Sequence, residues 1–235
     1  MKSLANLHFS AQVNNRMWCV ILYLMRDVGV CGTFWVHSNQ GWRMNKERLE
    51  AFSDGLFSVV ITIMVLELRV PVGHISWAAL GDMMPMFLTY LLSFVYGGIF
   101  WINHHYLLAA TKRVNSGILW ANLNFLFWLT LIPFFTAWVD ENQAAPVPVA
   151  AYGALLLVVI LSYRLLEWVL FGAHHGNALI VRTLRQGQRE RASIVALILA
   201  IILAFNYPYA AVAIYVGVAI MWFLPDRELE DALND

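Results

Sequence analysis

One stretch of the sequence, Arg48 to Arg69, decides the fold: R-L-E-A-F-S-D-G-L-F-S-V-V-I-T-I-M-V-L-E-L-R. A helix needs about 20 predominantly apolar residues to cross the hydrocarbon core of a bilayer, and the stretch between the two arginines has that length. It carries an aspartate, Asp54, about two turns inside. Because a carboxylate inside a membrane costs at least a few kcal/mol, Asp54 is a candidate functional residue.

The predicted helix has two unlike faces when successive residues are placed about 100° apart. One face is bulky and apolar, and it suits lipid or neighbouring helices. The other face is small, polar or moderately sized. It suits either a close contact between helices, where small and hydroxyl residues are common, or a narrow path for water. The residues of this second face are Gly55, Ser58, Val59, Thr62 and Leu66.

The composition of the whole chain is that of a membrane protein. Of its 235 residues 60% are hydrophobic and 13% are charged, and the mean hydropathy is +0.64. These values lie outside the range of soluble domains, and a net charge of zero gives no sign of a nucleic-acid partner. The sequence has no metalloprotease, cysteine-rich, phosphate-loop or serine-nucleophile motif, so we expect no enzyme, no metal and no cofactor.

Five further apolar runs follow the first one. We therefore predict an all-α integral membrane protein with six transmembrane helices, the third of them kinked at Pro133. A pair of charges on the fourth run, Arg164 and Glu167, has the spacing of an ion pair within one helix. The runs after the first are residues 80–108, 118–139, 147–171, 192–205 and 209–224.

The basic residues set the predicted orientation, since cytoplasmic loops carry an excess of lysine and arginine. With the N-terminus in the cytoplasm, Arg69 alone falls in an outside loop. An even number of spans returns the C-terminus to the cytoplasm. The basic residues then on the inside are Arg43, Lys46, Arg48, Lys112, Arg113, Arg182, Arg185, Arg189, Arg191 and Arg227.

This topology brings polar residues of the first three helices to a similar depth. Asp54 lies about 9 Å above Arg48, and polar residues of the next two helices lie at a comparable height. Polar groups in lipid need partners, so we predict one structural network between these helices. Its candidate members are Arg48, Phe52, Ser53, Asp54, Trp101, His104, His105, Asn122 and Asn124, with the choice between the two histidines left open.

The pattern R-x-x-x-F-S-D, formed by Arg48, Phe52, Ser53 and Asp54, resembles the signature of the transmembrane protein 175 family. The likeness continues through W-I-N-H-H at 101–105 and covers most of residues 44–225. The members of this family are potassium channels of bacterial and archaeal membranes and of endosomes and lysosomes. The resemblance implies a homotetramer in which the first helix of each subunit lines a central pore.

The resemblance also implies where the pore narrows. The carbonyl filter T-V-G-Y-G of other potassium channels is absent, so selectivity must come from side chains. The positions that match the constriction of the family are Val59, Thr62, Ile63 and Leu66, with Gly55 and Ser58 on the same pore face. The family usually has a larger isoleucine or leucine at the position of Val59, so the valine departs from the family pattern, and the tightness of this ring does not follow from the resemblance.

We therefore expect a leak-type potassium channel of a prokaryotic plasma membrane. Its partners are other copies of itself, the lipid bilayer and the permeant potassium ions. The alternative is a proton-coupled transporter or a proton channel that uses Asp54 with His104 or His105. Residues 44–225 form the channel domain and residues 226–235 an acidic cytoplasmic tail. Residues 1–43 are either an extension outside the family pattern or a wrongly assigned start.

Overall fold

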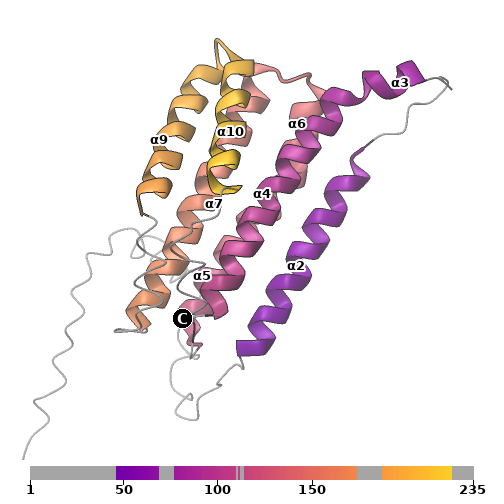
Figure 1. The fold of residues 1–235 in the computed structure, drawn as a ribbon. Coiled ribbons are helices and arrows are strands. Elements are labelled where there is room, and N and C mark those ends of the chain that lie inside the picture. The colour runs from indigo at the N-terminus through magenta and orange to yellow at the C-terminus, as the bar shows by residue number, and fades with distance from the viewer. Residues whose placement is uncertain (1–45, 69–76, 110, 112–113, 174–186, 224–235) are drawn as a thin grey trace, which may run out of the picture. The chain divides into compact units, whose positions relative to one another are not determined.

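The computed structural model describes residues 46–68, 77–109, 111, 114–173 and 187–223 (Figure 1). The expected extension over residues 1–43 and the tail over residues 226–235 lie outside this part of the chain. Every element in the described ranges is a helix, in agreement with the predicted all-α class. The helices are α2 (Lys46–Leu66), α3 (Trp77–Asp82), α4 (Met84–Ala109), α5 (Ser116–Leu129), α6 (Ile132–Glu141), α7 (Pro146–Ala173), α9 (Gly187–Ala204) and α10 (Pro208–Phe223).

Four helical segments are long and apolar enough to cross a membrane. They are α2, α4, the stretch Ser116–Glu141 that combines α5 with α6, and the first 25 residues of α7. The last two helices are shorter or more charged. Helix α9 has 18 residues, of which Arg189, Glu190 and Arg191 are charged, and α10 has 16. The chain is thus a multi-pass membrane protein, whereas six spans remain a prediction.

Prolines explain two of the boundaries. The run predicted from residue 80 is divided into α3 and α4, and Pro85 is the second residue of α4. The predicted kink at Pro133 is confirmed as a break, because α5 ends at Leu129 and α6 begins at Ile132. Proline fits the first turn of a helix, where its missing N–H has no intrahelical acceptor, and it disrupts the interior.

Helix α7 lies at the centre of the packing and α2 at one edge. Helix α7 contacts α5, α6, α9 and α10, whereas α2 packs on α4, α5 and α6. In Figure 1 α2 and α9 are on opposite sides of the helices described. The buried residues of α2 recur every three or four positions, so they form one stripe, and the other described helices leave the opposite side of α2 uncovered. These buried residues are Leu49, Ser53, Phe57, Val60 and Met64.

A glycine allows α10 to approach α7 closely. The hydroxyl of Tyr215 on α10 donates a hydrogen bond of 3.0 Å to the carbonyl of Val149 on α7. A Cβ added at Gly153, one turn further along α7, would collide with the ring and hydroxyl of Tyr215. The side chain of Tyr215 is buried, with 1% of its surface exposed, so the ring has little room to move away.

We expect Gly153→Ala to lower the thermal unfolding temperature of the purified protein, because overpacking a core costs about 1–3 kcal/mol. The matched control is Gly172→Ala on the same helix, where an added Cβ has nothing within 4 Å. That change should leave the temperature unchanged or raise it, since alanine favours a helix by about 0.5–1 kcal/mol over glycine. Equal effects of the two substitutions would contradict the packing role of Gly153.

Candidate functional site

One exposed stripe of α2 contains all the predicted pore residues. Leu66 is 76% exposed, Val59 is 56% exposed and Ile63 is 42% exposed. Gly55, Ser58 and Thr62 are exposed on the same helix. Such a stripe faces either lipid or another protein chain, since contiguous apolar surface marks an interaction site. The structure therefore brings the six residues to one uncovered surface of the subunit.

The two hydroxyl groups of this stripe present oxygen to the exterior. Ser58 Oγ donates to the carbonyl of Asp54 at 2.9 Å, and Thr62 Oγ1 donates to the carbonyl of Ser58 at 2.7 Å. Each hydroxyl has one proton and two acceptor lone pairs, so the donated proton is used within the helix. The lone pairs of each hydroxyl oxygen remain available at the surface. They can bind a cation or accept a hydrogen bond from a water molecule.

Behind the stripe, a buried chain of hydrogen bonds joins α2, α4 and α5. Asn122 Nδ2 on α5 donates to Ser53 Oγ on α2 at 3.0 Å, and Ser53 Oγ donates to the carbonyl of Leu49 at 2.9 Å. Asn122 Oδ1 and His104 Nε2 on α4 are 2.7 Å apart. Because a carbonyl oxygen accepts, His104 Nε2 carries the proton. Ser53, His104 and Asn122 are each at most 1% exposed.

Asp54 belongs to a separate contact on the uncovered side. Trp101 Nε1 on α4 donates to Asp54 Oδ1 at 2.9 Å, and the His105 ring lies 6.0 Å from the Trp101 ring, centroid to centroid. Asp54 is half-buried and Trp101 is 41% exposed. The predicted single network is therefore two groups, because Ser53 and Asp54 point about 100° apart on the helix. His104 joins the buried group and His105 does not.

Three other predicted members of the network lie outside both groups. Arg48 is exposed, and within the described part of the chain no ion pair joins it to Asp54. Phe52 is 52% exposed on the uncovered side of α2. Asn124 is half-buried, and none of the hydrogen bonds found among the described residues includes its side chain. The structure thus reduces the buried network to Ser53, His104 and Asn122.

The predicted pair of Arg164 and Glu167 is confirmed and has a third member. Arg164 Nη1 is 3.0 Å from Glu167 Oε2 on α7, and it also pairs with Glu190 Oε2 on α9. The two glutamates are buried. The sequence prediction missed Glu190 because it started the fifth helix at residue 192, whereas α9 begins at Gly187. The charged residues just before that apolar run were the signal that could have indicated an earlier start of the helix.

We expect Asn122→Leu to reduce the yield of folded protein and to lower its unfolding temperature. The change leaves His104 and Ser53 without their buried partner, at a cost of about 1–3 kcal/mol for each unpaired group. Asn124→Leu, two residues along the same helix, is the control and should have little effect. The measurement is size-exclusion chromatography with thermal unfolding in detergent. Equal losses in both variants would mean that the buried chain does not stabilise the subunit.

Comparison with known proteins finds relatives that are named potassium channels. The family model described as endosomal/lysosomal potassium channel TMEM175 matches residues 48–133, from α2 into α6. A potassium channel of Chryseobacterium sp. (strain P1-3) is 45% identical over 192 residues, which are 82% of this chain and 100% of that protein. A potassium channel of Chamaesiphon minutus is 33% identical over 50% of this chain and 62% of its own length.

A solved structure and an animal protein of the same family also match this chain. The crystal structure of a lysosomal potassium-selective channel TMEM175 homolog from Chamaesiphon minutus matches with a TM-score of 0.66 and 26% identity. The match covers 75% of this chain and 95% of that one. The endosomal/lysosomal proton channel TMEM175 of Bos taurus is 38% identical over 85 residues, which are 31% of this chain and 18% of the bovine protein.

The residues matched by the family model include both polar groups around α2. The family is one of channels rather than enzymes. The similarity to the Chryseobacterium protein extends over the full length of that protein. Taken with the family model and the likeness of fold, it shows that this chain belongs to the TMEM175 family.

Proposed function

We propose that this protein is a potassium-permeable, leak-type channel whose pore is formed between subunits by the uncovered face of α2. The observation that carries the proposal is the exposure of Val59, Thr62 and Leu66 on one side of a membrane-length helix. The bacterial relatives named potassium channels support a potassium channel for this chain as well.

The proposed pore requires several copies of the chain. One subunit supplies one α2, and a single helix cannot enclose a path for ions. A closed ring of identical subunits gives each exposed stripe the same surroundings, and we propose a homotetramer. In this assembly α9 and α10 also span the plasma membrane, and both termini lie in the cytoplasm, as the distribution of basic residues favours.

Side chains narrow the proposed pore in layers about 5 Å apart along α2. Leu66 and Val59 form apolar collars, which shed water and so oppose the passage of hydrated ions. Ile63 adds to the apolar wall. Thr62 lies between the collars, and its outward-facing oxygen replaces part of the hydration shell of a cation. Valine at position 59 makes a wider collar than leucine or isoleucine, which favours leak.

Proton conduction is the second candidate, because the bovine relative is named a proton channel. In this chain His104 is 1% exposed and is bonded to Asn122 behind α2, so it does not reach the uncovered face. Asp54 accepts a hydrogen bond from Trp101 on the side of that face. This geometry favours structural roles for Asp54 and His104 over a proton relay, and it supports potassium as the permeant ion.

The assembly can be tested by disulfide cross-linking. In a protein whose Cys19 and Cys31 are replaced by serine, Thr62→Cys should give disulfide-linked dimers on mild oxidation, because neighbouring stripes meet around the pore. Leu199→Cys, at a residue 53% exposed on α9, is the control and should remain unlinked. A protein that is monomeric in bilayers and still conducts potassium would contradict the intersubunit pore.

The constriction can be tested by making a collar polar. Leu66→Asn should wet the collar and raise potassium flux in proteoliposomes by about ten-fold, which corresponds to a barrier lowered by about 1.4 kcal/mol. The same substitution should weaken the preference among cations. Leu199→Asn on α9 makes an identical change away from the stripe and should leave flux unaltered. Unchanged or reduced flux in Leu66→Asn would mean that the stripe packs against another helix and does not line the pore.

A further inference from the structure

A cluster of three ionisable side chains joins α7 to the start of α9. Arg164 Nη1 is 3.0 Å from Glu167 Oε2 and also pairs with Glu190 Oε2. Glu167 is 2% exposed and Glu190 is 3% exposed. The two carboxyl groups lie within hydrogen-bond reach of each other. The cluster therefore places two buried carboxyl groups against one guanidinium.

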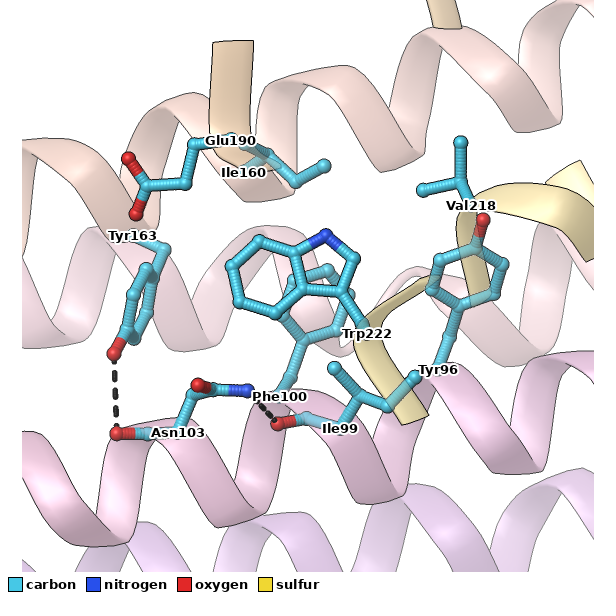
Figure 2. A pocket seen from close by; sticks show the side chains of 9 residues that line it. All are labelled: Tyr96, Ile99, Phe100, Asn103, Ile160, Tyr163, Glu190, Val218 and Trp222. Carbon is cyan, nitrogen blue, oxygen red and sulfur yellow. Dashed lines mark hydrogen bonds between the residues drawn. The ribbon is translucent and has the colours of Figure 1, made fainter. Parts of the chain in front are cut away.

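The surroundings of Glu190 are poor in hydrogen-bond donors. Figure 2 shows its side chain at one end of a small pocket whose lining is almost entirely apolar. Tyr163 lies at the same end, but its hydroxyl donates to the backbone carbonyl of Asn103 at 3.0 Å. Among the described residues, Glu190 Oε2 accepts no hydrogen bond of good geometry. The carboxyl group thus has a buried oxygen that lacks a donor.

The other titratable groups on the described helices around the cluster are directed elsewhere. On α9, Arg189 is half-buried and Arg191 is exposed, and each points about 100° away from Glu190 around the helix. Helix α5 has no titratable residue, and Asp140 and Glu141 of α6 precede Pro146 at the opposite end of α7. The remaining groups have partners of their own: His104 is bonded to Asn122, Tyr96 to the Tyr215 carbonyl and Tyr215 to the Val149 carbonyl.

Charge balance indicates that one of the two carboxyl groups carries a proton. Two carboxylates and one guanidinium would leave a negative charge uncompensated away from water, which is costly. A proton removes this charge and supplies the missing donor, because an ionised carboxylate has only acceptor oxygens. Glu190 lies in the first turn of α9, where the helix dipole favours a negative charge, whereas Glu167 lies toward the C-terminal end of α7. The proton is therefore on Glu167.

We propose that Arg164, Glu167 and Glu190 form a proton-binding site that holds the start of α9 against α7. When the proton leaves, the O–H bond of Glu167 breaks, the proton passes to water, and two carboxylates then repel each other beside one guanidinium. Alkaline pH therefore weakens the contact between the two helices. The site lies within one subunit and apart from the α2 stripe, so it does not depend on the proposed pore.

Infrared spectroscopy detects the proton directly, because a protonated carboxyl group has a C=O stretch that a carboxylate lacks. Full-length protein with carbon-13 in its glutamate carboxyl groups, in lipid bilayers at neutral pH, should show this band. Glu167→Gln and Glu190→Gln should both lose it, since each leaves one carboxylate for Arg164. Glu50→Gln, which alters the exposed ion pair with Lys46, is the control and should keep it. No band in the unaltered protein, or a band that persists in either variant of the site, would overturn the proposal.

Thermal unfolding against pH gives a second readout. A glutamate of the unfolded chain ionises near its ordinary pKa of about 4.3, so above that pH the folded state binds one proton more than the unfolded state. Stability then falls as the pH rises, by about ten-fold in the folding equilibrium per pH unit, until the folded site has lost its proton and the infrared band has disappeared.

Glu167→Gln separates this site from every other titrating group. Its amide replaces the protonated carboxyl as a donor, so the variant should fold, and its unfolding temperature at acidic pH should be close to that of the unaltered protein. At alkaline pH it should unfold at the higher temperature of the two, because it has no proton to lose. An equal decline with pH in both proteins, or a Glu167→Gln protein that does not fold, would overturn the proposal.

Discussion

The hydrogen bonds of Asn122 with Ser53 and His104 fix the orientation of α2, and the proposed pore depends on that orientation. Within a membrane a polar side chain has no water to bond, so it must find a partner in the protein. Turning α2 about its axis would remove Ser53 from Asn122 and leave buried polar groups unpaired. The bulky stripe that includes Phe57 and Met64 is held toward α4 and α5 for the same reason, and the opposite face stays uncovered.

The subunit has two separate buried polar groups. The contacts of Ser53, His104 and Asn122 position the helix that carries the proposed pore residues. The second group is the set of ion pairs around Arg164, which joins α7 to α9. The family model ends at residue 133, so the second group lies in a part of the chain that the model does not match.

Local sequence patterns predicted much of this arrangement because they act within one helix. The two faces of α2, the break near Pro133 and the pair of Arg164 with Glu167 each depend on helical spacing alone. Such patterns could not predict the contacts between helices. The spacing did not separate Ser53 from Asp54 as members of different groups, and it did not choose between the two histidines. Glu190 was missed because helix boundaries depend on packing as well as on hydropathy.

The central claim is that these subunits together form a passive path for potassium, and flux from proteoliposomes under opposed potassium and sodium gradients tests it most directly. Vesicles with potassium inside and sodium outside should develop an inside-negative potential without a coupled ion, at rates far above those of a carrier. A pH-sensitive dye in the same vesicles reports any proton movement. Strict coupling of potassium to protons, or no flux at all, would contradict the claim.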